Sequence, residues 1–192
     1  LCDPDVFVPD LEDSVAVGDK EEARETVRAH IELLSSTGRP VIPRLNSLDT
    51  GLLKDDLSAI AVPGVFGVSV GKVGDIGDIA EIIALMDSAE RNAGLEIGSI
   101  KLLPWIETAS GVINSFSILS ASERICGAAF GAEDFTNDMG IERREDSREI
   151  MHAKNYLVIT AKAAMVPALD TPFFAFRDTE GLNEDSMFSR SI

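Results

Sequence analysis

Residues 65–73, with the sequence VFGVSVGKV, decide the fold class of this chain. Apolar side chains stand next to each other at positions 65 and 66, and valine returns at 68, 70 and 73, so the run does not alternate strictly between apolar and polar residues. Runs of this kind are typical of strands whose two faces are both covered, as in a parallel sheet with helices outside it. We therefore predict a buried parallel strand here.

Similar short apolar runs occur along the whole chain and alternate with longer amphipathic stretches. The predicted strands are residues 6–11, 41–45, 65–73, 100–106, 125–130 and 166–169. The predicted helices are residues 20–36, 52–60, 76–93, 111–120 and 145–164. Connections of this length make parallel βαβ units, because parallel strands need a crossover. The pattern predicts one α/β domain over residues 1–192, either an open doubly wound sheet or part of a (β/α)8 barrel.

The composition excludes several classes of protein. The chain has 192 residues, of which 45% are hydrophobic, as expected for a packed globular domain. Its longest apolar runs are too short to span a bilayer, and its N-terminus lacks the features of an export signal, so we expect a cytoplasmic protein without membrane contact. A net charge of −16 opposes binding to nucleic acid.

Charged residues follow the predicted strands at their C-terminal ends. In strand order they are Asp10, Glu12 and Asp13; Arg44; Lys72; Glu107; Glu133 and Asp134; and Asp170. In a barrel these ends converge on one mouth, which is where barrel enzymes carry out their chemistry. This convergence favours the barrel over the open sheet.

Glu107 and Asp134 lie about one βαβ repeat apart, so they can project from neighbouring strands toward one point. Each contact between like charges at 4 Å costs roughly 4 kcal/mol at an effective dielectric constant of about 20, so the acidic mouth needs neutralisation. A metal ion, raised pKa values or partner arginines would all serve. Oxygen ligands without histidine or thiolate suit Mg²⁺, which favours a magnesium site at Glu107 and Asp134.

Two basic residues stand at the same predicted mouth. Arg44 ends its strand, where its guanidinium can bind a carboxylate or a developing enolate oxygen through two hydrogen bonds. Lys72 can add a second positive charge, although a plain salt bridge to the acidic residues is an equally good reading of this lysine. We predict substrate contacts for Arg44, Lys72 and Glu107.

The chain resembles the HpcH/HpaI aldolase and citrate lyase beta-subunit family of acyl-CoA lyases. Six short motifs occur in family order over nearly the whole chain: Asp10-Leu11-Glu12-Asp13-Ser14-Val15, Lys20 with Ala23-Arg24, Pro43-Arg44-Leu45-Asn46, Trp105-Ile106-Glu107-Thr108, Gly131-Ala132-Glu133-Asp134-Phe135 and Leu169-Asp170-Thr171. Each motif is short, but their common order is specific.

This resemblance implies a (β/α)8 barrel that binds Mg²⁺ through Glu107 and Asp134. It implies cleavage or formation of a carbon–carbon bond in a 3-hydroxyacyl-CoA such as malyl-, citramalyl- or citryl-CoA. The metal and Arg44 would stabilise the enolate charge that develops. Glu12 and Asp13 resemble the acidic catalytic loop of the family, which orders metal-bound water.

The chain also departs from the family pattern. Gly71-Lys72-Val73-Gly74 stands where many relatives have Pro-Lys-Val-Glu, so a carboxylate near the mouth is missing. The resemblance implies a first strand before Leu1 and a last strand after Ile192, so we expect an incomplete barrel. It also implies a C-terminal segment that reaches a neighbouring subunit, and hence a homo-oligomer, a trimer or a multiple of it.

Two other functions fit parts of the sequence. Gly67-Val68-Ser69-Val70-Gly71 matches the nucleophile elbow of serine hydrolases, with Asp134 and His152 following in the required order. The glycines and β-branched residues after Ser69 disfavour the helix that an elbow needs. A non-catalytic protein that binds a CoA ester or an acidic ligand on the same barrel is the second alternative, because a fold does not fix function.

Overall fold

The computed structural model describes residues 4–144, 146–175 and 177–192. Its sheet has five parallel strands among these residues, in the order β1-β2-β3-β4-β5. Their bounds are β1 Arg44–Leu45, β2 Gly67–Val70, β3 Lys101–Ile106, β4 Ala128–Phe130 and β5 Ala168–Leu169. Each new strand joins the same side of the sheet, which is the order of a barrel wall, whereas a doubly wound sheet reverses its order. The predicted parallel α/β fold of barrel type is confirmed.

The predicted strand over residues 6–11 is a bridged segment instead of a regular strand. Phe7 pairs with Val41 and Asp10 pairs with Arg44, both in parallel. The prolines at positions 9 and 43 have no N–H to donate, so a continuous ladder cannot form along these two segments. For the same reason, β1 is shorter than the predicted strand 41–45. The segment still lies beside β1 and brings the first acidic residues to the mouth.

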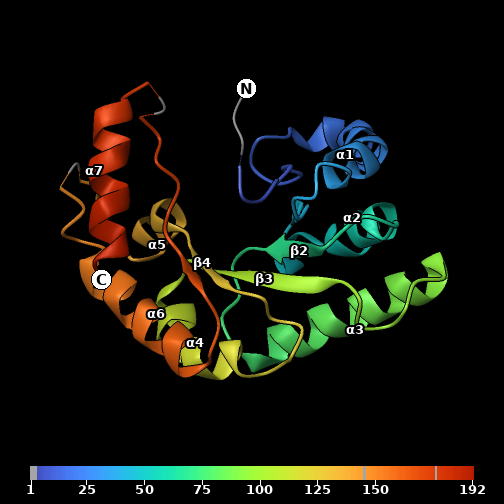
Figure 1. The fold of residues 1–192 in the computed structure, drawn as a ribbon. Coiled ribbons are helices and arrows are strands. Elements are labelled where there is room, and N and C mark those ends of the chain that lie inside the picture. The colour runs from blue at the N-terminus through green and yellow to red at the C-terminus, as the bar shows by residue number, and fades with distance from the viewer. Residues whose placement is uncertain (1–3, 145, 176) are drawn as a thin grey trace.

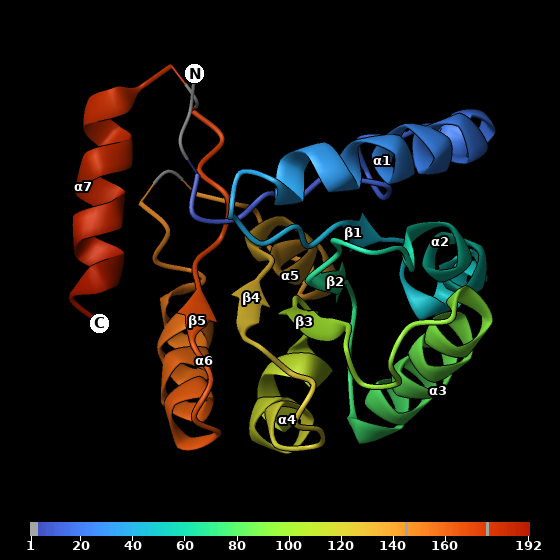
Figure 2. The same cartoon turned by 45° about the vertical axis from the view of Figure 1, so that its right-hand side comes forward.

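Helices cover the outer side of the curved sheet (Figure 1). Those that connect the strands are α1 Lys20–Ser35, α2 Leu53–Ile60, α3 Ile76–Ala93, α4 Ala109–Leu119 and α6 Met151–Ala163. Figure 2 shows these helices outside the strands, while α7 Thr179–Arg190 lies at one edge of the fold, where its Ser189 bonds to Asp170. The sequence is helix-like directly before Ile192, but its patterns gave no bounds for α7, and they missed α5 Ala132–Asp138 and the 3-10 turns η1 Val17–Asp19 and η2 Leu48–Thr50.

Two helix starts differ from the prediction. Helix α4 begins two residues early, because the side chain of Thr108 accepts a hydrogen bond from the Gly111 N–H and caps the helix. Helix α6 begins at Met151 instead of position 145, which lies outside the described residues. The turns before it are tied by Arg143, whose guanidinium bonds to Glu149 at 2.6 Å.

The core fills the space between the sheet and the helices. On β3, Leu102 and Ile106 belong to this core, while Leu103, Trp105 and Glu107 line a cavity on the opposite face. Each large aliphatic side chain buried in the core contributes about 1.5–3 kcal/mol. Alternate side chains of β3 therefore pack in the core on one face and line the cavity on the other.

Within the part of the chain that the structure describes, none of the helices combines the length and the hydrophobicity that crossing a membrane requires.

Candidate active site

A cavity of about 550 Å³ opens at the carboxyl ends of the strands. Seven charged residues predicted at the mouth line it, and they come from several loops and strands: Asp10, Asp13, Arg44, Glu107, Glu133, Asp134 and Asp170. Glu12 and Lys72 are in reach of the same place, because both interact electrostatically with Glu107. The structure therefore assembles the predicted site residues, while their chemical roles stay predictions.

Glu107 is the most enclosed carboxylate of the cavity. It follows the last residue of β3, its exposed fraction is 3%, and its Oε1 accepts a hydrogen bond of 2.7 Å from the Lys72 N–H. A Cβ atom built on Gly131 would lie 2.2 Å from Oε2, and one on Gly71 would lie 2.5 Å from Oε1. The absence of a side chain at these two glycines therefore leaves room for this carboxylate.

Lys72 adopts a φ of 57°, which is uncommon for a residue with a side chain. This conformation ends β2 and turns the Lys72 N–H toward Glu107. Burial lowers the pKa of the Lys72 ammonium, but Asp134, Glu12, Asp49 and Asp13 raise it by more. Lys72 is therefore a firmly charged cation that faces the acidic residues.

Two carboxylates at the mouth hold protons unusually tightly. Burial raises the pKa of Glu107 to about 7, the nearby Asp134 and Glu12 carboxylates add to this rise, and the Lys72 N–H opposes it. Burial also raises the pKa of Glu12 to about 7, with Arg44 opposing the rise and Asp13 adding to it. Such values mean that the chain alone supplies too little positive charge to keep both carboxylates ionised.

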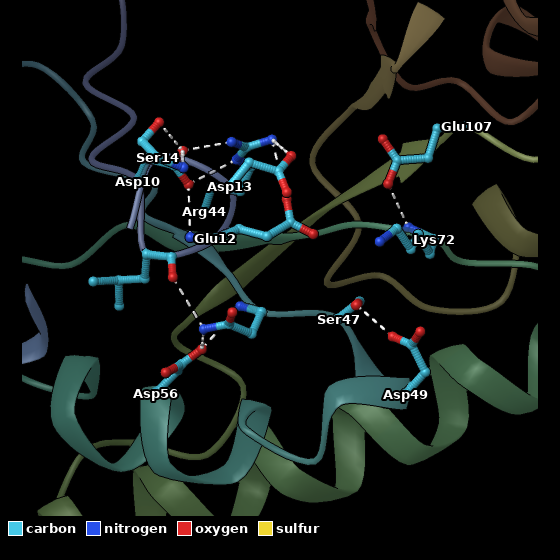
Figure 3. A network of polar contacts seen from close by, with 12 residues as sticks. Asp10, Glu12, Asp13, Ser14, Arg44, Ser47, Asp49, Asp56, Lys72 and Glu107 are labelled. Atoms are coloured by element: carbon cyan, nitrogen blue, oxygen red, sulfur yellow. Dashed lines mark hydrogen bonds and ion pairs between the residues drawn. The ribbon is translucent and has the colours of Figure 1, made fainter. Parts of the chain in front are cut away.

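Arg44 binds the acidic loop, which we define as Asp10, Glu12 and Asp13 (Figure 3). Its Nε and Nη2 bond to the two oxygens of Asp10 at 2.8 and 2.5 Å. Its Nη1 lies 3.0 Å from a Glu12 oxygen and 3.5 Å from an Asp13 oxygen. Its guanidinium carbon lies 5.8 Å from the ring centre of Trp105. Arg44 is thus fixed in place before any ligand arrives.

The bond to Arg44 also sets the charge of Asp10. Burial raises the pKa of the Asp10 carboxyl, but hydrogen bonds from Arg44, Ser14 and the Glu12 N–H together outweigh this effect and hold the pKa below its usual range. Burial likewise lowers the pKa of the Arg44 guanidinium, but its hydrogen bonds to Asp10 raise this pKa by more, so that it lies above its usual value. This pair is therefore ionised at any pH at which the protein works.

A buried polar chain supports the acidic loop from below (Figure 3). Asp56 on α2 is fully buried and accepts hydrogen bonds from the Asn46 N–H at 2.8 Å and from its side-chain amide at 2.7 Å. The same amide lies 3.1 Å from the Leu11 carbonyl oxygen. Lys20 donates to the carbonyl oxygens of Leu11 and Glu12 at 2.6 and 2.7 Å. The backbone that carries Glu12 is thereby held by two elements outside the mouth.

The site fits a hard divalent cation. Glu107 and Asp134 offer only oxygen atoms, and Asp134 is half-buried in the first turn of α5. Glu12 is buried, and among the described residues its Oε1 has no hydrogen-bond partner. No group of three or more histidine, cysteine or acidic side chains in this part of the chain forms a complete metal cage. Two carboxylates with positions left for water suit Mg²⁺, and the unpartnered Glu12 oxygen can accept from such a water.

Two other acidic residues of the mouth are already neutralised. Glu133 is exposed, and its Oε1 lies 3.2 Å from the Nε of Arg143. Asp170 accepts hydrogen bonds from Lys154 at 2.7 Å and from Ser189, and although burial raises its pKa, these bonds hold it below the usual range. Neither residue needs a metal ion to balance its charge.

The geometry argues against a serine hydrolase. Ser69 is fully buried inside β2, the strand continues to Val70, and the next helix begins only at Ile76. A nucleophile elbow instead places its serine at a tight turn directly before a helix. Its Oγ has no hydrogen-bond partner among the described residues, and His152 is exposed on α6.

Sequence reasoning gave no role to several residues of the site. Trp105 was recognised only as part of a motif, yet it lies beside Arg44 in the cavity wall. Its position two residues before Glu107 on a strand places it on the same face, so the alternation of strand side chains was the signal that could have found it. Predicting the contact between Gly131 and Glu107 would have required the register of β3 and β4, which patterns in a single sequence do not give.

The chain is similar in sequence to known proteins over nearly its whole length. A family model described as HpcH/HpaI aldolase/citrate lyase matches residues 1–192. Citrate lyase subunit beta from Leuconostoc mesenteroides subsp. cremoris is 33% identical over 188 residues, which are 98% of this chain and 62% of that protein. Mitochondrial citramalyl-CoA lyase from Rattus norvegicus is 29% identical over 192 residues, which cover 95% of this chain and 56% of that protein.

A solved structure gives the same picture of the fold. The citrate lyase beta subunit from M. tuberculosis, complexed with oxaloacetate and magnesium, matches with a TM-score of 0.73 and 26% identity over 94% of this chain and 74% of that chain. This chain spans 62% of the length of its Leuconostoc relative. The family match, which extends over all 192 residues, decides the assignment. The chain belongs to the HpcH/HpaI aldolase/citrate lyase family.

Proposed function

We propose that this protein is a Mg²⁺-dependent carbon–carbon lyase that cleaves or forms a 3-hydroxyacyl-CoA of the malyl, citramalyl or citryl type. The observation that carries the proposal is the buried Glu107 carboxylate beside Asp134, with a pKa of about 7 and, among the described residues, no cationic side chain bonded to its oxygens. The names of the relatives, citrate lyase subunit beta and citramalyl-CoA lyase, support the reaction class.

Each residue of the site has a defined task in this reaction. Mg²⁺ held by Glu107 and Asp134 would supply positive charge where the enolate oxygen becomes negative. Arg44 keeps a fixed guanidinium next to the same space, so no reorganisation is needed when charge develops there. Glu12 provides an unbonded carboxylate oxygen that can orient a water molecule. Asp13 is exposed at the rim and helps to hold Arg44, and Lys72 balances the negative charge.

The test is an assay of the full-length protein with malyl-, citramalyl- and citryl-CoA, with and without Mg²⁺. Glu107→Ala should lower turnover about a thousandfold or more, because losing several kcal/mol of enolate stabilisation costs tenfold per 1.36 kcal/mol. Glu22→Ala, an exposed change on α1, removes the same charge and should leave the rate unchanged. Normal Mg²⁺ affinity and turnover in the Glu107 variant would show that the metal assignment is wrong.

The second candidate is a non-catalytic protein that binds a CoA ester on the same site. Gly74 favours this reading, because the family resemblance implies a glutamate at this position and the glycine offers no carboxylate. Calorimetry with acetyl-CoA and each acyl-CoA separates the two functions. Mg²⁺-dependent binding without turnover would identify the binding protein, and turnover would identify the lyase.

We also propose that the full-length protein is a homo-oligomer, a trimer or a multiple of it. Ile113 and Phe116 on α4 and Ile159 on α6 are exposed apolar side chains on two helices that pack together, and they are available for such an interface. Light scattering that finds an active monomer would refute this state.

A further inference from the structure

We infer that Trp105 sets the size of the substrate fragment that this site accepts, so that fragments with longer carbon chains bind more weakly. The inference rests on the proposed lyase function and adds a specificity-determining residue to it. Trp105 is the one tryptophan of the chain, and it lines the cavity beneath Arg44 and Glu107.

The position of Trp105 follows from the geometry of β3. Leu103, Trp105 and Glu107 alternate onto the cavity face, and a strand rises about 3.3 Å per residue, so Trp105 lies roughly 6.6 Å along the strand from Glu107. A ligand whose oxygens lie at Glu107 and whose carbon chain points down the cavity therefore meets the indole after a short distance.

Two small residues lie beside Trp105 in the cavity wall. Its register partner on β4 is Ala129, which also lines the cavity, and Gly131 follows on the same face. On its other side, the Arg44 guanidinium carbon lies 5.8 Å from the ring centre and is itself bound to Asp10. The indole thus lies between a fixed cation and small residues, so a smaller side chain at position 105 would enlarge the cavity.

Conservative substitutions of Trp105 can test the effect of its side-chain volume alone. Among the described residues, the Nε1 of Trp105 is buried and has no hydrogen-bond partner. Trp105→Phe therefore removes no hydrogen bond, and Trp105→Leu removes more volume while keeping an apolar side chain. Leu102→Val is a matched control, because Leu102 lies on the core face of the same strand and does not line the cavity.

The experiment measures binding and condensation of glyoxylate, pyruvate, 2-oxobutyrate and 2-oxovalerate by the full-length protein with Mg²⁺. Binding is followed by calorimetry and condensation with acetyl-CoA by kcat/KM, with melting temperatures as a check on folding. One methylene in an apolar pocket changes discrimination by about tenfold or more, so Trp105→Leu should raise the ratio of kcat/KM for 2-oxovalerate to that for glyoxylate by at least that factor. Trp105→Phe should raise it less, and Leu102→Val should leave it unchanged.

Three results would overturn the inference. An unchanged ratio in two folded Trp105 variants would remove the size-setting role, and so would wild-type protein that binds 2-oxovalerate as tightly as glyoxylate. In both cases the lyase function would stand, because the acids still bind and react. Wild-type protein that binds none of the four acids would overturn the inference and the proposed function together.

Discussion

Gly131 and Glu107 fit together so closely that no side chain can be added to the glycine. A Cβ atom on Gly131 would lie 2.7 Å from the Glu107 Cβ and 2.2 Å from its Oε2. The contact involves the stem of Glu107 and not only its mobile end, so the glutamate cannot simply swing aside. The position of this carboxylate is therefore determined by the neighbouring strand.

The first prediction follows from this contact. Gly131→Ala should displace Glu107 and lower Mg²⁺ affinity at least tenfold, with a loss of about 1–3 kcal/mol of unfolding free energy from overpacking. Calorimetric titration and urea denaturation measure the two effects. Gly18→Ala is the control, because nothing lies within 4 Å of its added Cβ. Equal Mg²⁺ affinity in both variants would contradict the close fit.

The second prediction concerns the support of the acidic loop. Asn46→Ala removes the amide that joins Asp56 to the Leu11 carbonyl and should cost about 1–2 kcal/mol of stability, as for a lost buried hydrogen bond. It should also weaken Mg²⁺ binding, because the loop that carries Glu12 loosens. Ser115→Ala, which breaks the buried 2.8 Å bond to Thr160 between α4 and α6, is a control of similar cost.

Melting temperatures and Mg²⁺ titrations of these two variants decide the point. The serine variant should lose stability and keep its metal affinity, whereas the asparagine variant should lose both. If both variants lost melting temperature and Mg²⁺ affinity to the same extent, metal binding would depend only on overall stability.

The third prediction is a dependence of stability on pH. Because the pKa of Asp10 lies below its ordinary value of 3.8, the ionised carboxylate stabilises the folded state above that pH, and this contribution is lost as the pH falls. Asp10→Asn should therefore be less stable than the wild type by about 2 kcal/mol at pH 7. The difference should shrink below about pH 4. Urea denaturation from pH 3 to pH 7 measures it, and a constant difference would refute the shift.

The fourth prediction concerns the opposite end of the sheet, away from the site. Glu90 on α3 is fully buried and accepts hydrogen bonds from the Ile100 N–H at 2.7 Å and from Arg124 at 2.8 Å. Glu90→Ala should cost about 3 kcal/mol, because Arg124 loses its buried partner. Glu81→Ala, an exposed change on the same helix, should cost almost nothing in chemical denaturation. Equal midpoints would show that the pair is not structural.

The sequence predicted the features that depend on local patterns. Helix α3 begins and ends at the predicted residues, since its apolar spacing, the Asp75 cap and the terminal Gly94 all agree. The barrel mouth was also predictable, because strand ends of a parallel sheet meet at one edge. Helix α5 was missed because it follows β4 after a single residue and is too short to show a period.

The contacts inside the site were harder to predict, because they depend on register and packing. Arg44 was expected to face a substrate, but the structure shows most of its donors bonded to Asp10, Glu12 and Asp13. No spacing in the sequence reveals which carboxylate binds which arginine. The raised pKa values of Glu12 and Glu107 likewise follow from burial, which a linear pattern does not record.

The parallel order of the strands also determines when the site forms during folding. Asp10 and Arg44 bond across 34 residues of sequence, and Lys72 and Glu107 across 35. Contacts between distant residues carry a loop-closure entropy and form slowly, whereas helices form in microseconds or less. The acidic loop, Arg44 and Glu107 therefore come together only after the strands have paired, so a folding intermediate that already has its helices still lacks the site.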